Sequence, residues 1–242
     1  SFNKHINECL TDLKNEKFDV IVDLQNNLRS YKLKRELKVK NYSFLKLNIE
    51  KWLLVNFKIN KLPNVHIVDR YFKAVKSLGV VNDKKGLEYY IPQHDEVAPE
   101  NIDSKLKDGY CAFVIGGQHY TKILPPEKAA LIISKIDMPI VLLGGPDDRK
   151  RGEEIFRMSQ DSNIINTCGE LNINQSASLV SLAEVVITND TGLMHIAAAF
   201  DKPTISIWGN TIPEFGMYPY MPENPDNYFI SEVEGLKCRP CS

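Results

Sequence analysis

The chain has 242 residues, 43 % of them hydrophobic, and its 30 basic and 31 acidic residues leave a formal net charge of -1. This length supports a large core in one or two domains, and the balanced charge gives no overall argument for nucleic-acid binding. Five cysteines do not form the pattern of a disulfide framework, so we expect a reducing, cytoplasmic setting. No run of about 18 apolar residues occurs, and the start SFNKHINECL does not resemble a signal peptide, so neither a membrane span nor export is predicted.

The first 95 residues predict part of an N-terminal α/β domain. The run FDVIVDL, residues 18–24, is rich in β-branched residues and favours a buried strand. The segment VDRYFKAVKSLG, residues 68–79, has a helical pattern. We therefore place an N-terminal domain at residues 1–95.

A basic stretch lies between these two elements. Residues 28–58 carry nine Lys and Arg residues against Glu36 and Glu50, a net charge of +7. Apolar residues, Trp52 and Phe57 among them, are interspersed with the bases. Two interpretations stay open: a surface that meets anionic lipid or an anionic acceptor, or a solvated helix with an ordinary core face.

The amino-acid composition changes after this N-terminal region. Residues 91–108 are polar and contain prolines, which predicts a linker, placed at residues 96–108.

From residue 109 to 242, apolar strand-like runs alternate with helical patterns. The five strand candidates are YCAFVIGG, PIVLLGG, NIINTCG, EVVITND and PTISIWG, and four helix candidates separate them. This alternation predicts a parallel, doubly wound sheet of Rossmann type, because parallel neighbours need crossover helices.

Glycine-rich turns follow several of these strands, where ligands of such sheets bind. The turn GGQHYTK, residues 116–122, fails the P-loop pattern, since Ile123 stands where Ser or Thr would hold magnesium. Thr121 and Lys122 would suit a diphosphate, and a solvated loop lysine is the alternative. The later turn LLGGPDDRKRG lacks GxGxxG, which argues against a nicotinamide dinucleotide.

A second candidate site follows the fourth strand run, in the segment TNDTGLMHIAAAF. Asp190 falls at the expected start of a helix, where it is either an ordinary N-cap or part of a ligand site. Gly192 would let a ligand approach the backbone, and helix N–H groups together with the helix dipole favour an anion. His195, four residues after Thr191, would border that site on the same helix face.

The chain closes with a CRPC pair, Cys238 and Cys241. A zinc site needs two further ligands, and none follows the pair. We predict no metal and no cofactor.

The block NDTGLMHIAAAFDKPTISIWGNTIPEFGMYP resembles the bacterial ADP-heptose:lipopolysaccharide heptosyltransferase family, glycosyltransferase family 9. The segments FDVIVDLQNNLRS, HIVDRYFKAVKSLG, TKILPPEK and CRPC are similar to the same family, so the resemblance covers nearly the whole chain. It implies an α/β fold of GT-B type, with two Rossmann-like domains of which the N-terminal one is incomplete here. The family's catalytic aspartate belongs to an N-terminal segment that nothing before Ser1 matches, so the general base is not found in this chain.

The resemblance also implies roles for individual residues. Thr121 and Lys122 would contact the donor diphosphate, and Asp190, Thr191 and Gly192 would bind it at the helix N-terminus with His195 close by. Lys122 and Asp190 would be the catalytic pair. The acceptor-side residues would be Asp23, Gln25, Arg29, His66 and Arg70.

The function that follows is inverting transfer of a heptose or related sugar from a nucleotide sugar, with ADP-heptose as the suggested donor, to an anionic lipopolysaccharide-core acceptor. The setting would be cytoplasmic, with peripheral contact at the inner membrane and no nucleic-acid partner. The alternatives are a sugar-nucleotide-binding protein without catalysis, or an inactive fragment. A dehydrogenase is disfavoured, because GxGxxG is absent.

Overall fold

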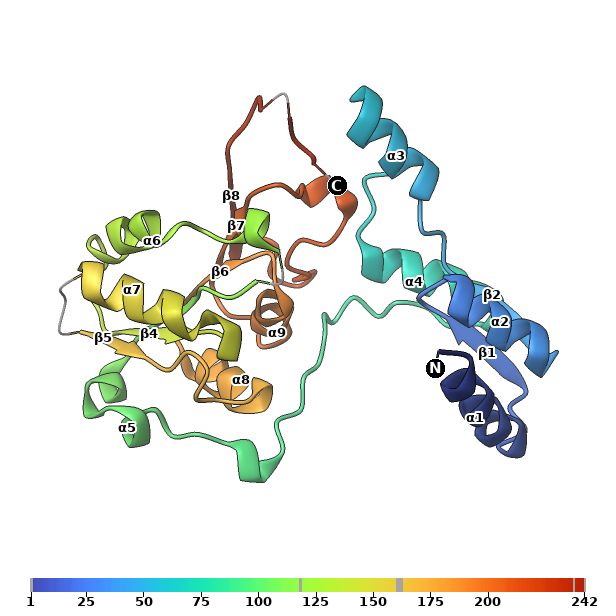
Figure 1. Ribbon diagram of the computed structural model, residues 1–242, viewed down its shortest axis with the longest axis horizontal. Coiled ribbons are helices and arrows are strands. Elements are labelled where there is room, and N and C mark those ends of the chain that lie inside the picture. The colour runs from blue at the N-terminus through green and yellow to red at the C-terminus, as the bar shows by residue number, and fades with distance from the viewer. Residues whose placement is uncertain (1, 118, 160–162, 237, 242) are drawn as a thin grey trace. The chain divides into compact units, whose positions relative to one another are not determined.

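The computed structural model describes residues 2–117, 119–159, 163–236 and 238–241. The chain divides into two compact units, unit 1 from Ser1 to Asp83 and unit 2 from Lys84 to Ser242. Both units are of α/β type, and each has its own parallel sheet (Figure 1). None of the described helices is both long and apolar enough to cross a membrane.

In its described residues, unit 1 holds a parallel pair of strands with four α-helices. The elements are α1 (Phe2–Asn15), β1 (Val20–Asp23), α2 (Leu28–Leu37), β2 (Lys40–Ser43), α3 (Asn48–Phe57) and α4 (Ile67–Val75), followed by the short 3₁₀ helix η1 (Lys76–Leu78). Val20 lies opposite Lys40 and Asp23 opposite Ser43. The predicted helix of this region is confirmed as α4 with η1. The predicted strand is confirmed as β1, but the expectation that it is buried is wrong, since Val22 is exposed and only Asp23 of its four residues is buried. The strand β2 was not predicted inside the basic stretch.

The crossover helix α2 begins at a capping box. The side chain of Asn27 accepts hydrogen bonds from the backbone N–H groups of Arg29 and Ser30, and the Ser30 hydroxyl accepts one from the N–H of Asn27. These contacts satisfy donors that a helix start leaves without partners. A helix therefore starts shortly after the end of β1, at Leu28, and returns the chain to a parallel neighbour.

Unit 2 contains a six-stranded sheet in which every pair of neighbours is parallel. Its strands are β3 (Cys111–Val114), β4 (Ile140–Leu143), β5 (Ile164–Asn166), β6 (Val185–Asn189), β7 (Thr204–Trp208) and β8 (Tyr228–Glu232), and its longer helices are α6 (Pro126–Ile133), α7 (Arg149–Ser159), α8 (Ile173–Leu182) and α9 (Gly192–Ala199). The five predicted strands and four predicted helices are confirmed. The sixth strand, β8, was not predicted.

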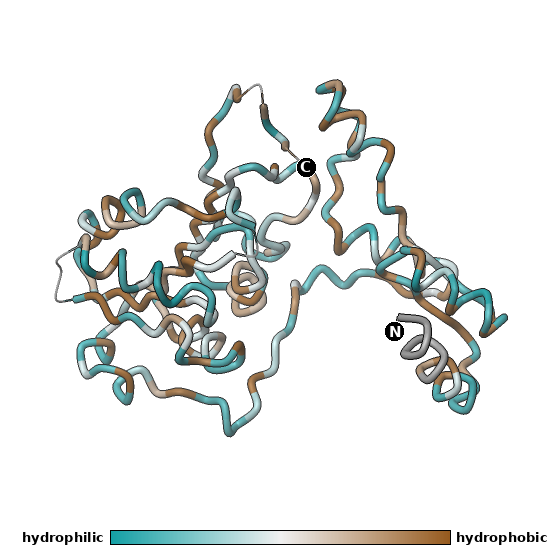
Figure 2. Tube along the Cα trace, viewed as in Figure 1, coloured by the Kyte–Doolittle hydropathy of each residue, from teal (hydrophilic) through white to brown (hydrophobic). Residues whose placement is uncertain are grey.

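Apolar residues of this sheet alternate between two cores, one on each face. Ala112 and Val114 pack with residues of α8 and α9, while Cys111 and Phe113 pack with residues of α6 and α7. Strands buried on both faces appear as continuous apolar runs, and the central strands of unit 2 are coloured hydrophobic in Figure 2. The predicted Rossmann-type sheet is thus confirmed.

The predicted linker at residues 96–108 instead belongs to unit 2. It contains α5 (Pro99–Ile102) and the 3₁₀ helix η3 (Ser104–Asp108), and Leu106 is buried in the core beside α8. The Val97 N–H donates to the Ser178 hydroxyl at 2.9 Å. The polar composition suggested a solvated linker, but these apolar and backbone contacts attach the segment to α8. The boundary between the two units lies instead between Asp83 and Lys84.

The strand order of unit 2 is β5-β4-β3-β6-β7-β8. The chain moves outward from β3 in one direction through β4 and β5, and then from β6 in the other direction. The order therefore reverses between β3 and β6, and open α/β sheets bind ligands beyond the carboxyl ends of their strands at such a point. This topology selects the segments after β3 and β6 as the place to look for a site.

Candidate functional site

The ends of β3 and β6 are joined by one buried side chain. The amide nitrogen Nδ2 of Asn189 lies 3.2 Å from the carbonyl oxygens of both Ile115 and Gly116, and it donates to them. Backbone acceptors that leave a sheet edge would otherwise be buried without partners. Asn189 thus links the ends of β3 and β6 at the reversal point of the sheet. The sequence did not predict this role, because only the adjacent Asp190 was interpreted as a site residue.

Lys122 and Asp190 meet directly at this reversal point. Nζ of Lys122, at the end of the 3₁₀ helix η4 (Tyr120–Lys122), lies 2.6 Å from Oδ2 of Asp190. The same carboxylate oxygen accepts a hydrogen bond from the hydroxyl of Thr211 at 2.8 Å. The Asp190 side chain is 7 % exposed and that of Lys122 20 %, so the carboxylate is buried and the ammonium group borders solvent.

Asp190 is not the N-cap of α9. That position belongs to Thr191, whose backbone is extended and whose side chain makes no capping hydrogen bond. The simple capping interpretation of Asp190 is therefore wrong, because its carboxylate is directed to Lys122 and Thr211 instead. The first turn of α9 keeps its N–H groups free of a side-chain cap, which suits an anionic ligand.

A cavity of about 650 Å³ opens beside this helix start. Thr191 and Gly192 lie on its wall, and a Cβ built on Gly192 would meet no atom within 4 Å. The remaining lining residues come from the ends of β3, β4 and β5 and from the start of α8, and include Gly116, Gly117, Gly145, Glu170, Asn172 and Ser176. The volume is in the range of small-ligand sites.

His195 lies one turn into α9, in the electrostatic field of the same pair. Burial lowers the pKa of His195, the positive charge of Lys122 lowers it further, and the carboxylate of Asp190 opposes the change. The imidazole is therefore neutral at pH 7 and can donate or accept a hydrogen bond without adding charge. His195 thus lies within electrostatic reach of Lys122 and Asp190, and its part in ligand binding stays a prediction.

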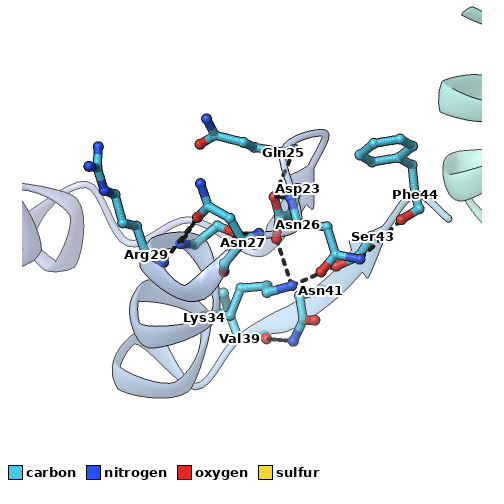
Figure 3. Close-up of polar contacts among 11 residues, drawn as sticks. Asp23, Gln25, Asn26, Asn27, Arg29, Lys34, Val39, Asn41, Ser43 and Phe44 are labelled. Carbon is cyan, nitrogen blue, oxygen red and sulfur yellow. Dashed lines mark hydrogen bonds and ion pairs between the residues drawn. The ribbon is translucent and has the colours of Figure 1, made fainter. Parts of the chain in front are cut away.

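In unit 1, Asp23 lies at the centre of a polar network at the end of β1 (Figure 3). One carboxylate oxygen accepts from the N–H groups of Gln25 and Asn26 at 3.0 and 2.7 Å, and the other lies 2.7 Å from Nζ of Lys34. Burial alone would raise the pKa of Asp23, but the Lys34 ammonium and these N–H donors outweigh it and lower the pKa to about 2. Both oxygens of this predicted acceptor-side residue thus have partners within unit 1.

The other predicted acceptor-side residues divide into exposed and buried ones. Gln25 and Arg29 are exposed, and their side chains point away from the Asp23 network in Figure 3. His66 is buried and caps α4, since its Nδ1 accepts from the Val68 N–H at 3.2 Å. Arg70 is buried within the same helix. Asp23 at the end of β1, Gln25 in the loop that follows and Arg29 at the start of α2 thus lie close together in the chain, whereas His66 caps α4 and Arg70 lies in that helix.

Comparison with known proteins identifies the family. A family model for glycosyltransferase family 9 (heptosyltransferase) matches residues 7–239. The chain belongs to glycosyltransferase family 9. The resemblance found in the sequence is thereby confirmed for this family 9 chain.

Individual relatives agree with this family. The family 9 chain is 26 % identical over 223 residues to lipooligosaccharide heptosyltransferase 2 of Haemophilus influenzae. The aligned region covers 83 % of this chain and 63 % of the relative. It is 35 % identical over 79 residues to lipopolysaccharide heptosyltransferase 2 of Salmonella typhimurium, 31 % of this chain and 23 % of the relative. The chain thus spans less than two thirds of the length of these heptosyltransferases.

Solved structures share the fold. The glycosyltransferase family 9 structure from Veillonella parvula has a TM-score of 0.71 at 21 % identity, and covers 94 % of this chain and 66 % of that one. The E. coli heptosyltransferase WaaC with ADP has a TM-score of 0.65 at 18 % identity, with coverage of 96 % and 72 %. The predicted α/β fold of GT-B type is confirmed by these matches.

Proposed function

We propose that this family 9 protein transfers a heptose from a nucleoside-diphosphate sugar to a lipopolysaccharide-core acceptor. The observation that carries the proposal is the Lys122–Asp190 pair at the reversal point of the unit 2 sheet, beside the uncapped start of α9. An ammonium group held next to the start of a helix would form a site for a diphosphate together with the helix N–H groups. Thr121, Thr191 and Gly192 complete this proposed donor site, with His195 behind it.

The proposed mechanism follows from where charge develops. When the bond between the anomeric carbon and the donor phosphate breaks, the sugar becomes oxocarbenium-like and negative charge grows on the leaving diphosphate. Lys122 has three N–H donors, of which Asp190 takes one, so the others remain for a phosphate oxygen. The N–H groups at the start of α9 would stabilise the same charge, and such preorganised donors act most strongly where charge forms.

Asp190 is assigned a supporting part in catalysis. Its carboxylate would repel a phosphate, but at 2.6 Å it holds the Lys122 ammonium group at the site. We assign no residue of the described chain as the general base that activates the acceptor hydroxyl. Inversion at the anomeric carbon is the stereochemistry we propose, in line with the family.

ADP-heptose is the donor that we propose. The E. coli heptosyltransferase WaaC, similar to this chain in fold, has been solved with ADP and with ADP-2-deoxy-2-fluoro heptose. The cavity of unit 2 extends from Gly192 to the start of α8, which leaves room for a nucleoside next to the diphosphate position. No side chain in this cavity identifies the base by itself.

The acceptor is proposed to be anionic and to meet unit 1. Lys51 lies near other positively charged groups. Burial lowers the pKa of Lys51, and the charges of Arg70 and Lys46 lower it further. Clustered positive charges favour a negatively charged saccharide. The exposed Gln25, in the loop after β1, and the exposed Arg29, at the start of α2, would add hydrogen-bond donors. Asp23, His66 and Arg70 would hold this acceptor side in shape.

Peripheral contact with the cytoplasmic face of the inner membrane is also proposed. Helix α3 exposes Ile49, Trp52 and Phe57, with Leu45 exposed just before it, and the rings of Trp52 and Phe57 lie 5.2 Å apart. Exposed aromatic and aliphatic side chains next to Lys46 and Lys58 are suited to an anionic lipid surface.

A transfer assay distinguishes this function from binding without catalysis. The chain is incubated with ADP-heptose and a lipopolysaccharide acceptor that lacks heptose, and released ADP and the heptosylated product are both measured. Product formed with the wild type and lost in Lys122→Ala supports the proposal. ADP-heptose that binds but is never transferred would instead support a sugar-nucleotide-binding protein.

A further inference from the structure

The segment after β7 contacts both parts of the proposed lysine site. The hydroxyl of Thr211 donates to Oδ2 of Asp190 at 2.8 Å, the oxygen that also binds Lys122. The N–H of the preceding residue, Asn210, donates to the carbonyl oxygen of Thr121 at 3.3 Å. One short loop thus touches the carboxylate that holds the lysine ammonium group and the backbone that carries the lysine.

Gly209 makes this close approach sterically feasible. A Cβ at this position would lie 2.4 Å from the carbonyl oxygen of Thr121, far inside van der Waals contact. A glycine is therefore required for the loop to pack against the backbone of η4. Thr211 itself is buried, so its hydroxyl is a fixed element of the interior and not a surface group.

The loop is in turn fastened by the CRPC segment near the end of the chain. Nε and Nη2 of Arg239 both donate to the carbonyl oxygen of Thr211, at 3.0 and 2.6 Å. The guanidinium group also forms an ion pair with Glu232, at the end of β8, at 2.6 Å. The Cys241 N–H adds a hydrogen bond to the Asn210 carbonyl at 3.2 Å. Only 8 % of the Arg239 side chain is exposed, so these contacts lie largely out of water.

We propose that Thr211 and Arg239 are positioning residues for the proposed donor diphosphate, acting through Asp190 on Lys122. Thr211 fixes the carboxylate of Asp190 so that the Lys122 ammonium group stays beside the start of α9. Arg239 holds the backbone of Thr211 by two hydrogen bonds to one oxygen, which a lysine cannot reproduce. This inference rests on the proposed function, and it assigns a task to the CRPC segment that needs no metal.

The test is the preference of the protein for ADP over AMP, measured by calorimetry on the 242-residue chain. Lys122 is proposed to bind the diphosphate, so a displaced lysine lowers ADP affinity and leaves AMP affinity much less affected. For Thr211→Val we expect about a tenfold loss of the ADP preference, in keeping with the loss of a hydrogen bond to a charged group. Thr211→Ser, which keeps the hydroxyl, restores the preference, and Arg239→Lys lowers it in the same direction as Thr211→Val.

Thr204→Val is the matched control. Thr204 is a buried threonine at the opposite end of β7, and its hydroxyl bonds to the Lys202 carbonyl at 2.7 Å. The Thr204→Val variant loses this hydrogen bond, which does not involve Asp190, so we expect its preference for ADP over AMP to stay unchanged. An unchanged preference in Thr211→Val, or an equal loss of ADP and AMP binding, overturns the positioning role. A wild type that binds neither nucleotide overturns the proposed function as well, so the two failures are distinct.

Discussion

Lys122 and Asp190 are 68 positions apart in the sequence, yet Nζ of one lies 2.6 Å from Oδ2 of the other. Each residue follows a strand next to the reversal point of the unit 2 sheet, so the topology and not the local sequence brings them together. A buried carboxylate and an ammonium group that borders solvent stabilise each other there. This pairing also prepares the lysine to meet a phosphate.

Removing the lysine leaves a buried charge without its main partner. We expect Lys122→Ala to lower the free energy of unfolding by about 1–3 kcal/mol, since among the described residues the Asp190 carboxylate then keeps its hydrogen bond from Thr211 alone. The double variant Lys122→Ala with Asp190→Ala should regain part of this loss, because no buried charge remains. Urea unfolding of the wild type, the two single variants and the double variant gives the coupling energy. Strictly additive losses would show that the pair is not coupled.

Two substitutions of Gly192 distinguish effects on folding from effects on ligand binding. A Cβ at Gly192 meets no atom within 4 Å, so Gly192→Ala should fold normally and gain up to about 1 kcal/mol from helix propensity. Gly192→Val adds bulk at the cavity wall, where we expect ADP affinity to fall about tenfold through steric exclusion. Thermal unfolding and calorimetry on the same samples check both parts. Full ADP affinity in Gly192→Val would place the ligand elsewhere.

The lowered pKa of His195 predicts a pH-dependent stability. The unfolded chain binds a proton on this histidine near pH 6.5, while the folded protein resists it. The contribution of His195 is therefore fully present above pH 6.5 and is lost as the pH falls from 6.5 through the lower folded-state pKa. His195→Gln should flatten the unfolding free energy in that window. An NMR titration that gives a pKa of 6.5 or higher would refute the prediction.

Asp23 gives a test of the same sign in unit 1, at lower pH. Its pKa of about 2, against 3.8 in the unfolded chain, stabilises the fold above pH 3.8, and this contribution is lost as the pH falls towards 2. Asp23→Asn should destabilise the protein by about 1–3 kcal/mol at pH 7, because Lys34 then loses its carboxylate partner. Denaturant unfolding at pH 7 measures this change. A stability unchanged in Asp23→Asn would mean that the network is not formed in solution.

Exposed apolar residues of α3 should govern binding to anionic lipid. We expect the double variant Trp52→Ser with Phe57→Ser to bind vesicles containing phosphatidylglycerol about tenfold less than the wild type, since two large apolar groups are lost. Leu131→Ser with Phe156→Ser, two exposed apolar residues of unit 2, serves as the control. Neutral phosphatidylcholine vesicles test the part played by charge. Equal vesicle binding by all three proteins would dismiss the membrane contact.

The strands β3 and β4 could be predicted because all of their residues are buried, so that each appears as an unbroken apolar run. By contrast, β2 has the sequence KNYS, with no buried residue, and β8 lies at the sheet edge, so neither gave such a signal. Lys122 and Asp190 could each be selected from their places after strands. Their contact could not, nor could Thr211 and Arg239, because these depend on strand order and on loops that only the folded chain brings together.

The central claim is that the reversal point of unit 2 binds a nucleoside diphosphate through Lys122. Calorimetric titration of the chain with ADP, alongside UDP, GDP and NAD, tests it most directly. We predict selective binding of ADP by the wild type and its loss in Lys122→Ala, with circular dichroism showing that the variant is folded. ADP binding of equal strength in folded Lys122→Ala, or no binding of ADP by a folded wild type, would contradict the account.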